Sequence, residues 1–274
     1  MTLLLVGMSG FSQPTTDGNA WKLAWSDEFD IDGALNNEIW NFEEGFVRNN
    51  EAQWYQPNNA FCKGGKLIIE ARREKTKNPR YQPGSQDWQK NREYAEYTSS
   101  SVNTAGKREF LYGRFEICAK IDTLLGLWPA IWTLGIQGEW PRNGEIDIME
   151  CYPIGGVPHL LANVATGTQK QYVAKWNSKT LPVKYFTEKD SNWIHKFHVW
   201  RMDWDEDTIH IYLDDILLHV VQTELMKNPD GSQPFRQPHY LLLNMAIGGN
   251  NGGNPSATHF PQRYEIDYVR VYQK

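Results

Sequence analysis

The chain has 274 residues, of which 40% are hydrophobic and 22% charged, and its formal net charge is -5. This composition is that of a globular protein that can bury a core. A mildly acidic chain without long runs of one sign is a poor partner for nucleic acid or an anionic membrane. The aromatic content is high, with 12 Trp, 13 Tyr and 11 Phe. Most should pack a core, but Trp also stacks on the apolar faces of sugar rings.

The first 20 residues are predicted to stand apart from the folded domain. An apolar patch over Leu3–Met8 is followed by small residues to Ser12. It lacks a basic start and is short, so it is interpreted as the remnant of a signal peptide or as a disordered leader. We therefore expect a secreted, periplasmic or cell-surface protein without a membrane span. Residues 21–274 contain no linker, repeat or composition break and are predicted to form a single catalytic domain.

The rest of the chain alternates apolar and polar residues with a period of two, which indicates β-strands. In chain order, strands are predicted over residues 66–72, 113–121, 197–202, 209–213, 216–218, 239–247 and 264–272. Asp214 and Asp215 are predicted to make a hairpin turn. No long stretch keeps a helical period. The pattern predicts an all-β sandwich of two antiparallel sheets, in which a curved sheet would give an open, concave cleft for a long polymer.

The cysteine pattern argues against a zinc or redox site. Cys62, Cys118 and Cys151 are widely spaced, and there is no CxxC pair. At most one disulfide can form, and buried free thiols are favoured. His195 and His198 lie near each other but lack an evident third metal ligand.

Three acids stand within an apolar, β-favouring run at residues 144–150. Carboxylates in a half-buried strand are costly and repel one another. Alternation puts Glu145 and Asp147 on one face, and an extra residue in a β-bulge around Ile148–Met149 would return Glu150 to that face. Paired carboxylates with separated pKa values are the working groups of a retaining glycosidase. The alternative is a surface strand with scattered acids.

This motif and several other segments resemble glycoside hydrolase family sixteen, in its laminarinase-like branch. The family motif Glu-x-Asp-x-x-Glu is matched by Glu145, Asp147 and Glu150. Further matches, in the family's order, are Ser26–Phe29, Tyr112–Glu116, Gly126–Trp132, Trp140–Pro141 and Asp267–Tyr272. The resemblance covers about residues 21–274. It implies a β-jelly-roll sandwich and endo-hydrolysis of a β-linked polysaccharide with retention.

By this resemblance, Glu145 is the nucleophile that forms the glycosyl-enzyme. Glu150 is the acid/base that protonates the leaving oxygen and then activates water, and the two carboxyls should lie roughly 5–5.5 Å apart. Asp147 would raise the pKa of the acid, because a neighbouring carboxyl disfavours a second charge. No cofactor is expected for catalysis.

The resemblance also implies residues that bind the sugar chain. Trp128, Trp132 and Trp140 resemble the aromatic floor and wall of the family's negative subsites, with core packing as the alternative. Trp128 and Trp132 are spaced to share one face of a strand. Asn50, in an Asn-Glu segment, and Arg114 are predicted to hydrogen-bond sugar hydroxyls. For Arg114 the alternative is a structural ion pair.

Many members of that family carry a calcium ion away from the cleft. Glu28, the carbonyl of Gly65 and Asp267 stand at the matching places, and oxygen ligands suit calcium. The ion would tie the chain ends to the sandwich. The alternative is that Glu28 and Asp267 are ordinary surface acids.

One segment departs from the laminarinase-like pattern. Relatives usually place a cleft-facing His after the acids, whereas here His159 comes early and Asn163 or Thr166 holds that place. Asn163 is predicted to bind substrate, and segment 169–193 to build the positive-subsite side of the cleft. Because hydrogen bonds to hydroxyls discriminate strongly, one such change can exchange glucose for galactose preference.

Three functions remain open. The first is an endo-β-1,3-glucanase acting on laminarin or mixed β-1,3-1,4-glucan. The second is the same chemistry on a β-galactan or a galactose-containing host glycan. The third, disfavoured by three costly carboxylates, is a non-catalytic glycan-binding module. The expected partner is a polysaccharide, and the protein is expected to be a monomer.

Overall fold

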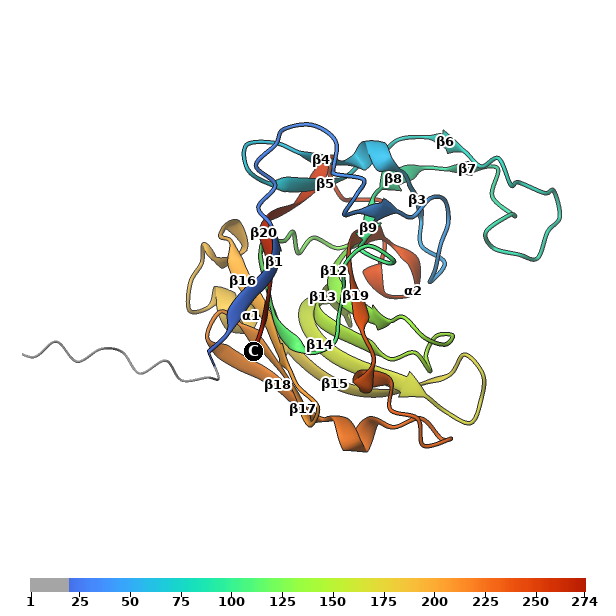
Figure 1. Ribbon diagram of the computed structural model, residues 1–274. Helices are drawn as coiled ribbons and strands as arrows, with labels where there is room; N and C mark the ends of the chain where they lie inside the picture. The colour runs from blue at the N-terminus through green and yellow to red at the C-terminus, as the bar shows by residue number, and fades with distance from the viewer. Residues whose placement is uncertain (1–19) are drawn as a thin grey trace, which may run out of the picture.

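The computed structural model describes residues 20–274, so the predicted leader lies outside it except for its last residue. Two antiparallel sheets of eight strands each pack face to face (Figure 1), which confirms the predicted sandwich. In the described residues the α-helices are single turns, α1 (Lys184–Thr187) and α2 (Gly249–Gly252). The 3-10 turns are Pro57–Asn59, Trp193–His195, Thr223–Met226 and Pro234–Arg236.

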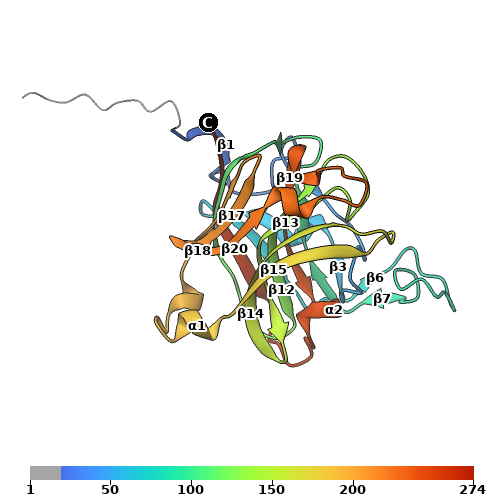
Figure 2. The ribbon, with the colours of Figure 1, turned by 90° about the horizontal axis from the view of Figure 1, so that it is seen from below.

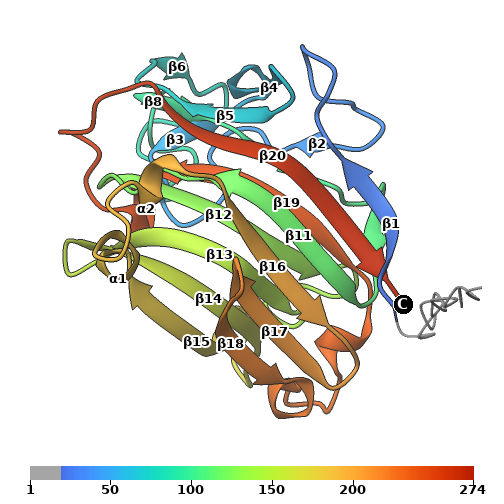
Figure 3. The same cartoon turned by 90° about the vertical axis from the view of Figure 1, so that its left-hand side faces the viewer.

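The first sheet has the strand order β18-β17-β16-β11-β20-β5-β4, with β1 also paired to β20. Its strands are β1 (Lys22–Asp27), β4 (Ala60–Cys62), β5 (Leu67–Ala71), β11 (Gly113–Lys120), β16 (His198–Trp204), β17 (Thr208–Leu213), β18 (Ile216–Gln222) and β20 (Gln262–Gln273). Strand β11 shows why the sheet forms. Phe115, Ile117 and Ala119 are fully buried, and the residues between them are partly exposed. Figure 3 shows this sheet in front of the other one.

The second sheet has the order β15-β14-β13-β12-β19-β9-β2, with β10 also paired to β19. Its strands are β2 (Asn41–Phe42), β9 (Ser101–Asn103), β10 (Glu109–Phe110), β12 (Leu127–Gly135), β13 (Glu145–Ile154), β14 (Val157–Gly167), β15 (Ala174–Pro182) and β19 (His239–Ile247). Figures 1 and 2 show that β13, β14 and β15 are strongly curved. The outer face of this curved sheet is free of the first sheet and is available for a ligand.

The hydrophobic core lies between the two sheets and contains large aromatic side chains such as Trp40, Trp200 and Trp204. Nine aromatic side chains are buried in this core and six more pack against it. The three cysteines are free thiols, buried or half-buried. Two small sheets extend the sandwich. One pairs β3 (Gln53–Tyr55) with β8 (Tyr97–Ser99), and the other pairs β6 (Thr76–Lys77) with β7 (Tyr94–Ala95) and projects from the body (Figure 1).

Candidate active site

Strand β13 carries a β-bulge that gathers its three acids on one face. Two consecutive residues of β12 pair with residues 147 and 149 of β13, so Ile148 is an extra residue without a partner in β12. Its side chain is fully buried in the core. The bulge predicted from the spacing of the acids is confirmed, and it places Glu145, Asp147 and Glu150 together.

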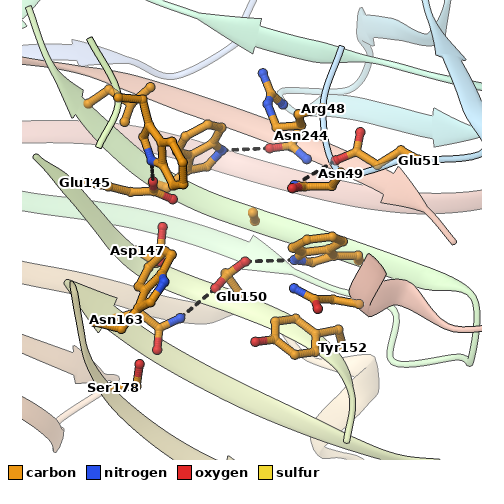
Figure 4. A pocket seen from close by; sticks show the side chains of 17 residues that line it. Arg48, Asn49, Glu51, Glu145, Asp147, Glu150, Tyr152, Asn163, Ser178 and Asn244 are labelled. Atoms are coloured by element: carbon orange, nitrogen blue, oxygen red, sulfur yellow. Dashed lines mark hydrogen bonds between the residues drawn. The ribbon is translucent and has the colours of Figure 1, made fainter. Parts of the chain in front are cut away.

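The face with the acids is the floor of an open cleft of about 700 Å³ (Figure 4). Residues of β12, β14, β15 and β19 complete the floor, and the 136–144 loop and the 48–51 segment contribute walls. Besides the acids, the lining residues are Arg48, Asn49, Glu51, Trp128, Ala130, Trp132, Leu134, Trp140, Tyr152, Asn163, Trp176, Ser178, Asn244 and Asn251. Four neighbouring strands from β12 to β15 span roughly 14 Å. The cleft therefore has room for a chain of several sugar rings.

The 136–144 loop brings Trp140 to the first acid. It returns to the sheet through Gly144, where φ is +80° and a Cβ would lie 2.8 Å from Pro234. Trp140 Nε1 donates a hydrogen bond to Oε2 of Glu145. Burial raises the pKa of Glu145, while the hydrogen bonds of Trp140 and Asp147 act to lower it. The carboxyl therefore has partners that stabilise its ionised form.

Glu150 is held on both oxygens. Trp128 Nε1 donates to Oε1 at 2.8 Å, and Asn163 Nδ2 donates to Oε2 at 2.7 Å. Burial first, and then the charge of Glu145, raise the pKa of Glu150 to about 7 against these two hydrogen bonds. A carboxyl with such a pKa keeps its proton in mildly acidic solution and can act as a general acid.

Asp147 lies between the two glutamates and is only 1% exposed. Neither of its oxygens has a well-formed hydrogen bond from a donor in the described residues. Burial, together with the charges of Glu145 and Glu150, raises the pKa of Asp147 well above its usual range. Its surroundings therefore favour the neutral form of Asp147, whose proton can be offered to a neighbouring carboxylate.

The three predicted tryptophans all line the cleft. Trp128 and Trp132 share the cleft face of β12, as their spacing predicted, and Trp140 stands on the wall with 38% of its surface exposed. Trp132 Nε1 donates to Asn244 Oδ1 at 2.7 Å, and the guanidinium of Arg48 lies 5.0 Å from its ring centre. These two contacts fix the ring of Trp132 in place.

The structure adds Tyr152 and Ser178 to the cleft residues that were expected from the sequence. Tyr152 follows Glu150 by two positions and shares its face, so strand alternation was a sufficient signal. Trp176 and Ser178 come from β15, where Ser178 is paired with Asn163 of β14. That pairing has no signal in the sequence. Segment 169–193 was correctly predicted to contribute to the cleft.

Asn50 does not line the cleft, although its neighbours Asn49 and Glu51 do. Asn49 and Asn50 both have positive φ, 56° and 52°, which makes a tight turn. The turn leaves Asn50 exposed, and its Nδ2 donates to Asn250 Oδ1 at 3.2 Å. The prediction is corrected because the contact with the cleft is made by the residues on either side.

Arg114 lies in the other sheet, on β11, away from the cleft. Its Nε and Nη2 donate to the two carboxylate oxygens of Asp203, each at 2.7 Å. The predicted sugar-binding role of Arg114 is corrected, since its guanidinium is held by this bidentate pair on the far side of the core. The alternative prediction, a structural ion pair, matches the contacts of Arg114.

The residues predicted to hold calcium do not fit a cation site. Both carboxylate oxygens of Glu28 accept hydrogen bonds from Arg270, at 2.9 and 2.8 Å, and this hydrogen bonding lowers the pKa of Glu28. A cation beside Glu28 would meet the guanidinium charge. Gly65 and Asp267 supply no further acid cluster, since residues 20–274 contain no group of three or more His, Cys, Asp or Glu suited to a metal. Pairing of β1 with β20 already ties the chain ends together.

The signal-peptide interpretation concerns residues that the structure does not describe. Among residues 20–274, no helix has the length and apolar character needed to cross a membrane.

Comparison with known proteins gives a consistent result. The model of the family described as glycosyl hydrolases family 16 matches residues 48–270. A β-glucanase of Rhodothermus marinus is 35% identical over 289 residues, covering 98% of this chain and 92% of that protein. The laminarinase catalytic domain of Thermotoga maritima superposes with a TM-score of 0.75 at 34% identity, covering 93% and 98%.

A further solved structure comes from work on endo-acting O-glycanases with which human gut bacteria initiate mucin breakdown. It superposes with a TM-score of 0.82 at 33% identity, covering 96% of this chain and 94% of the other. Both similarities extend over almost the whole chain and include the strands of the cleft.

Proposed function

Because this chain belongs to glycosyl hydrolases family 16, we propose that it hydrolyses internal bonds of a β-1,3-glucan such as laminarin, or of mixed β-1,3-1,4-glucan, with retention. The observation that carries the proposal is the carboxyl group arrangement on the bulged strand. Glu145, Asp147 and Glu150 meet in the middle of an open cleft, and their surroundings favour different protonation states. Relatives described as β-glucanase and laminarinase support a glucan substrate.

The chemistry follows from these surroundings. In the first step, a carboxylate oxygen of Glu145 attacks the anomeric carbon while Glu150 gives its proton to the leaving oxygen, and a glycosyl-enzyme ester forms. In the second step, the ionised Glu150 takes a proton from water, which attacks the same carbon and releases Glu145. Neutral Asp147 donates a hydrogen bond to Glu145 and adds no charge. Raising the pKa of Glu150 to about 7 keeps its proton available for the first step.

The walls of the cleft suit a long chain bound across the strands. Trp132 and Trp140 provide aromatic faces beside Glu145, and Trp176 provides another on β15, where it is 46% exposed. Sugar rings stack on such faces through their apolar C–H groups. We place the leaving-group side of the substrate over β14 and β15, because Asn163 and Ser178 line the cleft on that side of Glu150.

A second candidate substrate is a galactose-containing host O-glycan. Two observations favour it. The O-glycanase structure superposes with a TM-score of 0.82, against 0.75 for the laminarinase. By the resemblance, Asn163 or Thr166 also stands where laminarinase-like relatives usually place a His, so the cleft differs from theirs in its hydrogen-bonding groups. Buried hydrogen-bonding groups discriminate strongly between hydroxyl configurations.

The deciding experiment is to incubate the purified protein with laminarin, barley mixed-linkage glucan, a β-galactan and mucin O-glycans, and to size the early products. Oligosaccharides of intermediate length from laminarin support the glucanase proposal. Products from mucin or galactan alone would mean that the enzyme uses the same chemistry on a galactose-containing glycan. Glu145→Gln should abolish hydrolysis with each glycan while binding persists, and surviving activity would mean that Glu145 is not the nucleophile.

We also propose that the enzyme works outside the cell as a monomer. Its proposed substrate is a polymer that does not pass through a membrane, and all the cleft residues come from one chain. Light scattering during size-exclusion chromatography tests the oligomeric state, and fractionation of the source cells tests the location.

A further inference from the structure

The carboxyl of Glu150 is fixed by donors from the strands on both sides of it. Trp128 on β12 binds Oε1 and Asn163 on β14 binds Oε2 (Figure 4). Two donors on two oxygens set the plane of the carboxyl. They therefore set the direction in which its proton can be delivered.

Asn163 is in turn the cross-strand partner of Asp147, and their side chains are in contact. It is 4% exposed, and its Oδ1 is buried without a donor. Oδ1 is thus shielded from a sugar hydroxyl. An amide oxygen turned toward Glu150 would meet another acceptor, so the amide presents its NH2 group to the acids.

Asp147, in its neutral form, has one proton to share and a glutamate on either side. Both oxygens of Glu150 already accept an N–H. Of the Glu145 oxygens, only Oε2 has an N–H donor among the described residues. The free acceptor next to Asp147 is therefore on Glu145.

We propose that Asn163 is a positioning residue whose amide aims the Glu150 carboxyl at the leaving oxygen and directs the Asp147 proton to Glu145. This inference rests on the proposed function, since it takes Glu150 as the acid. When Glu150 gives up its proton and the glycosidic C–O bond breaks, the Asn163 N–H stabilises the carboxylate left behind. It keeps that contact while Glu150 takes the proton of water in the second step.

Other titratable or charged groups line the cleft with Glu150. They are Glu145, Asp147 and Tyr152 on its own strand, and Arg48 and Glu51 from the 48–51 segment. The cleft residues of β14 and β15 are Asn163, Trp176 and Ser178, none of which titrates. A change at Asn163 therefore alters the pH profile through its contacts with the acids alone.

The test uses Asn163→Ala, Asn163→His and the control Asn177→Ala. Asn177 lies on β15 between two cleft residues and so faces away from the cleft. Each variant is assayed on the polysaccharide that the wild type cleaves, and on an aryl oligosaccharide of the same sugars with a dinitrophenolate leaving group. Such a leaving group departs without protonation, so kcat/KM for it does not need the acid.

Asn163→Ala should lower kcat/KM on the polysaccharide by about 10- to 100-fold, because a misplaced acid protonates poorly. On the activated substrate the loss should stay below about threefold. KM should stay unchanged. The basic limb of the pH profile should move to higher pH by about one unit, since Glu150 loses a donor to its ionised form. His also offers an N–H, so Asn163→His should recover part of the rate.

Equal losses on the two substrates, a rise in KM with unchanged kcat, or an unmoved basic limb would overturn the proposal and leave Asn163 a substrate-binding or structural residue. Melting temperatures identify a variant that fails to fold, and Asn163→Ser, which adds no group that titrates near pH 7, then supplies the pH profile. An inactive wild type on laminarin refutes the proposed substrate only, because these ratios are measured on whichever glycan is cleaved.

Discussion

Replacing Trp140 by Phe keeps an aromatic ring on the wall of the cleft and removes one N–H donor to Glu145. A hydrogen bond to a charged group contributes about 1.5–3 kcal/mol. Trp140 is 38% exposed, so water can replace part of the lost contact and the lower figure applies. About 1.5 kcal/mol corresponds to roughly one unit in the pKa of Glu145.

The direction of the pKa shift of Glu145 depends on which form of the carboxyl the donor stabilises. The Trp140 N–H favours the carboxylate, so its loss raises the pKa of Glu145, and protonation disables the nucleophile at a higher pH. The acidic limb of kcat/KM should therefore rise by about one unit. The basic limb, set by Glu150 near pH 7, should stay in place. The bell-shaped pH profile of kcat/KM therefore becomes narrower, and its maximum falls.

The assay measures initial rates at low substrate concentration, which report kcat/KM, across the whole bell-shaped pH profile. Trp21→Phe is the matched control, because Trp21 lies against Arg114 in the other sheet. An acidic limb that does not move, with the rate reduced equally at every pH, would refute the hydrogen-bond reasoning. Trp140 would then act only by stacking on sugar.

Three further predictions concern the bulge, the ion pair and calcium. Inserting one Ala between Met149 and Glu150 shifts Glu150 by one position and turns it toward the core; hydrolysis should disappear and unfolding should become easier by about 3 kcal/mol or more, whereas an active variant would contradict the register. Arg114→Gln should cost about 1 kcal/mol, seen as a melting shift of roughly 2–4 °C, with kcat/KM unchanged; reduced sugar affinity would restore its predicted role. EGTA should leave the melting temperature within about 1 °C, since Arg270 already engages Glu28; a larger fall would show a bound cation.

Much of the fold was predictable because strand alternation is local. The predicted strand 239–247 coincides with β19, and 113–121 differs from β11 by one residue. The bulge was also predictable, since three acids cannot share a face at their spacing without an extra residue. The same reasoning placed Trp128 and Trp132 on one side of β12.

The sequence by itself thus determined the strands, the acids and the face they share. It did not determine which side chains from other strands would reach them. Asn163 was predicted to bind sugar but contacts Glu150, and Arg114 was placed in the cleft but lies in the other sheet. Trp176 enters the cleft from β15, where Ala165 is its cross-strand partner. Cross-strand register and the packing of two sheets join residues far apart in the chain, so only the tertiary structure decided these contacts.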